Sequence, residues 1–200
     1  MTKKALKLLL TIQAKGTCWF IGILALTIAI LFIVFSYVTI DDTSWIPLSI
    51  TYAPKIYLLV MGIVYPLITI KLYVSQGLTR KHFFWANTGA ISILSLFLLI
   101  PVLFSVIYYD SISLPSAITH YLQMPLFFLI GWTSVVGFQM RKWYAALLGI
   151  LGAIAMFHSI TTIPRILALS DLAALWSVLL LLIVALLILP RIISQIPLTS

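Results

Sequence analysis

The sequence contains no glutamate, only four aspartates and a single cysteine among its 200 residues. Cys18 alone cannot close a disulfide within the chain, and metal sites built on paired cysteines are excluded. The three histidines have no i, i+4 partner and no glutamate beside them, and no Ser, His and Asp residues converge in a local motif. We therefore expect no metal, no cofactor and no catalytic residue in this chain, which argues against an intramembrane enzyme.

Charged residues are scarce as well, at 8% of the chain, whereas a soluble domain has about a quarter. Hydrophobic residues make up 63% of the chain, and the mean hydropathy is +1.21. Such a chain could not cover its own surface in water, so most of its surroundings must be lipid. The net charge of +8 comes from short basic clusters between apolar runs. This pattern is typical of membrane topology and not of nucleic-acid binding.

Six segments have the length and composition of membrane-spanning helices, which need about 20 mostly apolar residues. They are 18–40, 56–74, 83–109, 122–140, 143–164 and 172–190. The sequence thus predicts one all-α membrane domain over 1–200, with no separate soluble domain. The one charge within the spans is that of Lys71, which lies close enough to a span end for its side chain to reach the headgroups. Because no acid lies in a span, ion-coupled transport is poorly supported.

Basic residues are unevenly distributed between the two sides of the predicted bundle. If the N-terminus is inside, ten of the twelve lie on the inner side: Lys3, Lys4, Lys7, Lys15, Lys71, Arg80, Lys81, Arg141, Lys142 and Arg191. The outer side holds Lys55 and Arg165, with all four acids: Asp41, Asp42, Asp110 and Asp171. The positive-inside bias therefore predicts a multi-pass plasma-membrane protein with both termini in the cytoplasm.

The N-terminal residues 1–17 have the pattern of a short amphipathic helix. Its basic stripe contains Lys4, Lys7, Thr11 and Lys15, at spacings of three and four. We expect this helix to lie on the inner leaflet. The residues leave open whether it only anchors the chain or also contacts another protein.

A stripe of small residues marks the fifth predicted span. Ala145, Gly149 and Ala153 recur every four residues and so share one face of a helix. Small side chains on one face allow a second helix to approach closely. We therefore expect this face to be a helix-packing surface.

The stretch KLYVSQGLTRKHFF, residues 71–84, is the longest run of polar and basic residues in the chain. Gly77 is expected to end the second span, and Thr79 to cap the helix that follows. The stretch therefore predicts a short helical elbow on the cytoplasmic side, between the second and third spans. A plain topology loop in contact with lipid phosphates would also use these basic residues, but it requires no particular order of them.

The order of residues in this elbow resembles the S-x-G-hydrophobic-T-R-K-x-F-F segment of small ABC-2-type permease subunits from Gram-positive bacteria. The matching residues are Ser75, Gln76, Gly77, Leu78, Thr79, Arg80, Lys81, His82, Phe83 and Phe84. Members of that family have six spans, cytoplasmic termini and an N-terminal interfacial helix. Outside these ten residues, the chain is similar to the family by its pattern of spans alone.

The resemblance implies a half-transporter that pairs with a second permease, identical or homologous, and with separate ATPase subunits that hold ATP and Mg. It implies that the ten residues are the ATPase-coupling interface, with Phe83 and Phe84 as a lever anchored in the membrane. The short outer loops then favour a compact exporter of lipophilic or amphipathic cargo, peptides included. The alternative is a non-transporting membrane protein, such as an immunity, sensor or assembly protein, and the composition suits that class too.

Overall fold

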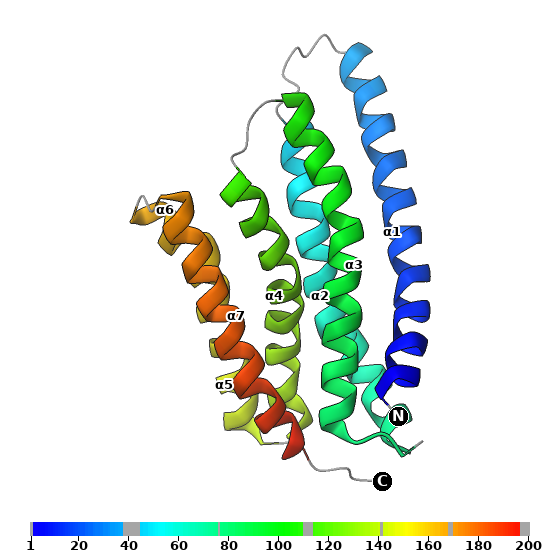
Figure 1. Cartoon of the computed structure of the whole chain (residues 1–200), viewed down its shortest axis with the longest axis vertical. Helices are drawn as coiled ribbons and strands as arrows, with labels where there is room; N and C mark the ends of the chain where they lie inside the picture. The colour runs from blue at the N-terminus through cyan, green and yellow to red at the C-terminus, as the bar shows by residue number, and fades with distance from the viewer. Residues whose placement is uncertain are drawn as a thin grey trace.

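The structure is a computed structural model that describes residues 2–37, 45–75, 77–109, 114–140, 142–167 and 170–196. Within these ranges the regular secondary structure is helical, without a strand, and short turns join the helices (Figure 1). The helices are α1 (Thr2–Tyr37), α2 (Trp45–Ser75), α3 (Arg80–Tyr109), α4 (Leu114–Gln139), α5 (Trp143–Thr161), α6 (Ile163–Ile166) and α7 (Asp171–Ser194). Six of them are long and apolar enough to cross a membrane. The predicted all-α fold with six helices able to span a membrane is thereby confirmed.

Two predicted spans were too short at the end opposite the chain termini. Helix α2 begins at Trp45, so Lys55 lies inside the helix and not in a loop. Likewise, α4 begins at Leu114 and includes His120. The prediction ended each span where polar residues appear, but a backbone in lipid must keep its hydrogen bonds and so continues as a helix. The expectation that Lys71 is the only charge within the spans is therefore wrong.

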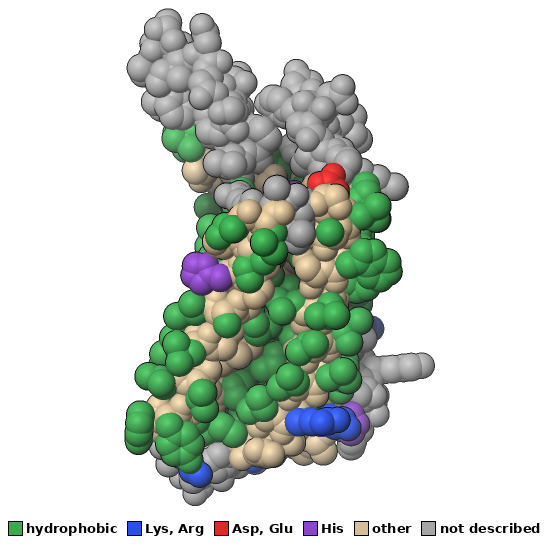
Figure 2. All heavy atoms as spheres, turned by 90° about the vertical axis from the view of Figure 1, so that its left-hand side faces the viewer, with side chains coloured by type: hydrophobic (Ala, Val, Ile, Leu, Met, Phe, Trp, Pro, Cys, Tyr) green, Lys and Arg blue, Asp and Glu red, His purple; other side chains and the backbone are tan. Residues whose placement is uncertain are grey.

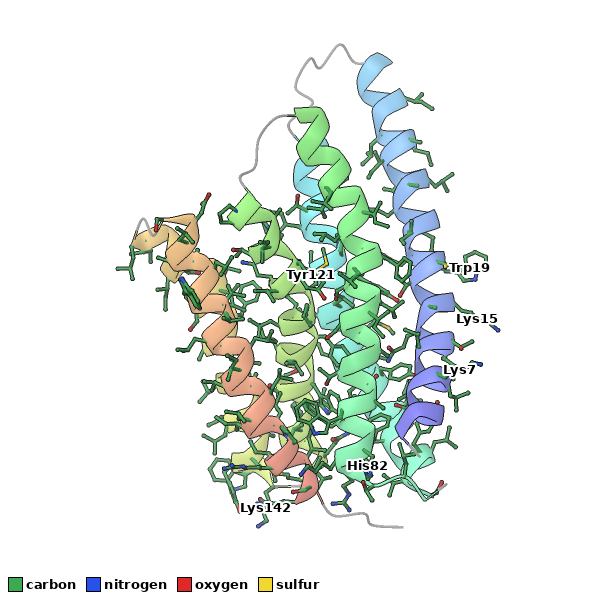
Figure 3. All side chains as sticks on the ribbon, viewed as in Figure 1. Lys7, Lys15, Trp19, His82, Tyr121 and Lys142 are labelled. Atoms are coloured by element: carbon green, nitrogen blue, oxygen red, sulfur yellow. The ribbon has the colours of Figure 1, made fainter. Side chains whose placement is uncertain are left out.

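The separate interfacial helix predicted over 1–17 is not confirmed. Helix α1 runs without interruption from Thr2 to Tyr37, and its apolar, membrane-length stretch already begins at Lys7. Lys7 and Lys15 are exposed, as expected, and point away from the bundle (Figure 3). The side chain of Lys4 lies outside the described residues.

The opposite face of α1 explains why the helix stays upright against the bundle. Leu9, Gln13 and Thr17, spaced by four residues, are buried. Gln13 Nε2 donates a hydrogen bond to Asn87 Oδ1 of α3, and Thr17 Oγ1 lies 3.2 Å from the hydroxyl of Tyr57 in α2. These polar contacts between helices hold the first half of α1 against α3 and α2, whereas a helix lying on the leaflet would lose them.

Helix α4 is the centre of the bundle and packs against α2, α3, α5 and α7. Two-thirds of its most apolar stretch is buried, 67%, against 6% for α1, which stands at the edge of the bundle (Figure 1). The aromatic core on α4 includes Phe128 and Trp132, both without exposed surface. A movement of α4 therefore reaches most of the other spans.

The predicted small-residue face of α5 lies against α4. A Cβ added to Gly149 would lie 2.9 Å from the carbonyl oxygen of Thr133, and one added to Gly137 would collide with the carbonyl of Ala145. Ala153 is buried as well. The same device joins α2 to α4, where Gly131 packs on the backbone of α2. Close approach of backbones is how helices associate where lipid provides no hydrophobic driving force.

The bundle has two chemically different ends. Helix α1 begins and α7 ends at the same end, which we call the terminal end, and we call the opposite one the far end (Figure 1). On the face shown in Figure 2, Lys and Arg side chains gather near the terminal end, an acidic side chain lies near the far end, and hydrophobic side chains cover the surface between them. That the terminal end faces the cytoplasm remains a prediction.

Candidate functional site

The predicted elbow is built at the terminal end from the last turn of α2. The amide of Gly77 donates to the carbonyl of Val74 (3.0 Å), and the amide of Leu78 donates to that of Tyr73 (3.1 Å). Gly77 has a φ of 86°, in the left-handed region that favours glycine. These features make a Schellman turn, which satisfies the last carbonyls of the helix. Gly77 ends α2 as the sequence predicts.

Thr79 begins α3 as its N-cap. Its Oγ1 accepts a hydrogen bond from the amide of His82 (3.3 Å) and lies 2.6 Å from His82 Nδ1, and its carbonyl accepts from the amide of Phe83 (2.9 Å). This is the geometry that satisfies a free amide in the first helical turn. The elbow is thus a tight link with Gly77, Leu78 and Thr79 between two helices, and not a helix of its own. Gln76 lies outside the described residues.

Two aromatic side chains join this link to the centre of the bundle. Phe83 and Phe84 are fully buried. The ring of Phe83 stacks on Tyr73 of α2, 5.6 Å between centroids, and both phenylalanine rings pack on Trp132 of α4, at 5.8 and 5.1 Å. These two rings, to which the resemblance assigns the role of a lever anchored in the membrane, therefore pack inside the protein against α2 and α4. Trp132 had no local sequence signal, since it lies on a different helix.

Polar groups of the elbow remain accessible at the terminal end. Ser75, Gly77, Thr79, Lys81 and His82 are exposed, and Leu78 is half-buried. His82 lies at the base of α3 (Figure 3). Half-buried Arg80 contacts the chain itself, because its Nη1 donates to the carbonyl of Ser194 (3.0 Å) at the end of α7. A cation there also interacts favourably with the helix dipole.

A second polar site, at the far end, was not expected from the sequence. Lys55 is only 3% exposed, and its Nζ lies 2.8 Å from His120 Nδ1 and donates to Gln123 Oε1 (2.6 Å). The ammonium also lies 5.1 Å from the centre of the Tyr52 ring. A charge inside a membrane helix is costly and needs such partners. The i, i+3 spacing of His120 and Gln123 was the signal that could have revealed this site.

These side chains line a cavity of about 580 Å³. Its walls include Phe127 and Phe157 as well as Asp171, which begins α7. Lys55 lies about 30 Å along α2 from Ser75 by the rise per residue, about the thickness of the hydrocarbon core. The cavity therefore opens near the far boundary of that core. It combines groups of both charges with aromatic walls, a lining suited to amphipathic molecules.

The part of the chain that the structure describes contains no group of three His, Cys, Asp or Glu side chains placed to hold a metal ion. No protein-family model, curated protein or solved structure matches this chain. The resemblance to ABC-2-type permeases therefore depends on residues 75–84 and on the six-span pattern.

Proposed function

We propose that this chain is the permease subunit of an ABC exporter, which moves a lipophilic or amphipathic substrate with energy from separate ATPase subunits. The observation that carries the proposal is the construction of the elbow. An exposed link with a fixed backbone at the terminal end is joined through Phe83 and Phe84 to Trp132 of the central helix.

This construction suits the transmission of a mechanical load. The turn at Gly77 is closed by two backbone hydrogen bonds and followed directly by the Thr79 cap, so a push on the link is not absorbed by a soft loop. The load passes to the first turn of α3 and through the buried rings to α4. Because close-packed interiors transmit displacement, closure of an ATPase pair against the link would tilt α3 and α4 together.

The far-end cavity supports an amphipathic cargo. Lys55 and Asp171 provide charges for a polar group, while Phe127 and Phe157 provide apolar walls. The cavity lies between α2, α4, α5 and α7, so displacement of α4 changes its shape. A second permease, identical or homologous, completes the transporter in the same bilayer, and cargo moves from the cytoplasm outward.

Copurification tests this proposal. The chain and a candidate ATPase are expressed together, and bound ATPase and cargo-stimulated ATP hydrolysis are measured. Gly77→Val forces a branched residue into the left-handed region and should abolish stimulation by cargo. Gly22→Val is the matched control, because Gly22 is exposed on α1 with open space around it. If no ATPase binds the parent chain, the non-transporting alternative takes its place. If Gly77→Val behaves like Gly22→Val, the stretch is a plain topology loop and not a coupling interface.

A further inference from the structure

A groove at the terminal end lies between the first turns of α3 and the last turns of α7. Its volume is about 270 Å³, and its walls include Lys81, Trp85, Leu187, Pro190, Arg191 and Ser194. The two helices run in opposite directions, and the bond from Arg80 to the carbonyl of Ser194 ties their ends together. The groove is therefore a fixed feature of the fold, on the outer surface of the bundle.

The lining residues are layered by depth. Lys81 is in the first turn of α3, and Arg191 is in the last turn of α7. One turn further into the span on each helix, about 6 Å deeper by the helical rise, lie Trp85 and Leu187. Both are well exposed, at 45% and 60%. Two cations at the rim thus stand above an aromatic and an aliphatic side chain on the wall.

The charge at the rim is unbalanced. Among the described residues, neither the Lys81 ammonium nor the Arg191 guanidinium makes a side-chain hydrogen bond or an ion pair. Asp171 is the one acid whose side chain is described. It begins α7 at the far end, so it lies a helix length away from the groove. The groove therefore presents positive charge to whatever lies beside it at the membrane boundary.

We propose that the groove binds one anionic phospholipid from the surrounding leaflet. Its phosphate lies between Lys81 and Arg191, and the beginning of an acyl chain lies over Trp85 and Leu187. Basic pockets between membrane helices are typical sites for anionic headgroups, and tryptophan favours the headgroup level. The apolar lower half distinguishes a lipid from a free phosphate ion, since it adds contact only for a molecule with a tail. The inference needs no ATPase and does not rest on the proposed function.

Quenching of Trp85 fluorescence tests the site in the full-length protein. The protein is placed in phosphatidylcholine nanodiscs that contain a small fraction of chain-brominated phosphatidylglycerol or chain-brominated phosphatidylcholine. The Trp85 signal is the difference between the parent and Trp85→Phe. Brominated phosphatidylglycerol should reach half-maximal quenching of this signal at a mole fraction at least about fivefold lower than brominated phosphatidylcholine does. A factor of about five corresponds to the attraction of one cation for an anionic headgroup. Equal quenching by the two lipids would reject the proposal.

Matched variants separate a site from general attraction to the leaflet. Lys81→Gln with Arg191→Gln should remove the preference for phosphatidylglycerol. Lys7→Gln with Lys142→Gln removes as much charge from exposed positions at the same end, outside the groove, and should keep the preference (Figure 3). If both pairs lose it equally, the attraction is diffuse and the groove is not a site. Helix content by circular dichroism and a single peak on size exclusion show that each variant is folded.

The source of the phosphate is decided by two further measurements. Millimolar inorganic phosphate should leave the preference for phosphatidylglycerol unchanged. If inorganic phosphate abolishes that preference, the groove is a site for small anions and not for a lipid. Leu187→Gln keeps both cations and should reduce the preference severalfold by removing contact with the tail. Leu180→Gln is the control, because Leu180 is similarly exposed on α7, at 65% against 60% for Leu187, but lies outside the groove. An unchanged preference in Leu187→Gln would overturn the lipid assignment.

Discussion

At the terminal end, the elbow is formed mainly by residues that follow one another along the chain, from Tyr73 to Phe84, while Trp132 of α4 and Ser194 of α7 contact it from elsewhere. At the far end, Lys55 meets His120 and Gln123 across 65 and 68 residues. The first region is held by backbone hydrogen bonds and buried rings, and the second by side-chain hydrogen bonds beside a cavity. The contacts of the elbow are thus mostly local, whereas those of the Lys55 cluster join two different helices, α2 and α4.

This difference suits the two tasks that we propose for the ends. A part that receives force works best when it does not deform. A part that binds and releases cargo works best when its contacts are individually weak and lie between elements that can separate. Helix α4 belongs to both regions, because it holds Trp132 at one end and His120 with Gln123 at the other.

The largest expected effect concerns the assignment of the two ends to the two sides of the membrane. With Cys18 replaced by Ala, a cysteine at Ser170 should react with an impermeant thiol reagent on intact cells, and a cysteine at Thr79 should react only after lysis. Both positions are exposed in the structure. A cysteine at Ile23, on the lipid-facing side of α1, is the unreactive control. Labelling at Thr79 from outside would exchange the two ends and contradict the proposed direction of coupling.

The next effect concerns the packing of α4 against α2, the two helices that contribute to both regions. Gly131→Ala places a Cβ against the carbonyl of Leu59, and backbone cannot move aside as a flexible side chain can. We expect a loss of about 3 kcal/mol, at the upper end of overpacking effects, measured as thermal unfolding in detergent. Gly152→Ala is the control, because its Cβ would meet the Thr133 methyl at an ordinary 3.6 Å. Equal stability of the two variants would show that the contact between α2 and α4 accommodates an added methyl group and is not tightly packed.

A double-mutant cycle tests the far end alone. His120→Leu removes one partner of the Lys55 ammonium, and we expect about 2 kcal/mol of destabilisation, as for other hydrogen bonds to charged groups. Combining it with Lys55→Met should restore most of the loss, since no orphaned charge remains. Thermal unfolding of the parent, the two single variants and the double variant gives the coupling. Additive effects would mean that water replaces His120 and that the cluster is not a unit.

The smallest effect concerns the terminal end. Thr79→Ala removes the hydroxyl that caps α3 and should cost about 1 kcal/mol, whereas Thr79→Ser keeps it and should cost little. Hydrogen exchange should rise in the first turn of α3 and stay unchanged around Lys55. Faster exchange at both ends would show that the elbow and the cavity are not independent regions.

Much of the architecture was predictable, because a helix that crosses a lipid bilayer needs a long apolar stretch, which is easily recognised in a sequence. Six apolar stretches predicted six spans, and the Gly77 stop and the Thr79 cap were predicted from local turn chemistry. The elbow residues are neighbours in the chain, so their contacts depend on conformations that the residues themselves favour. The small-residue face of α5 could likewise be predicted as a packing surface, although not which helix it contacts.

Other features depended on how the helices pack. The first half of α1 has the amphipathic pattern of an interfacial helix, but Gln13 finds Asn87 on α3 and the helix continues upright. The sequence predicts a loop position for Lys55, because burying a charge is unfavourable. In the folded chain His120 and Gln123 lie beside Lys55 and compensate for its burial. The sequence by itself determined the number of long apolar helices, the turn at Gly77 with the Thr79 cap and the uneven distribution of charge, since these follow from local propensity and transfer to lipid. Only the tertiary structure decided which polar groups meet, because the cost of burying each one depends on a partner that lies far away in the chain.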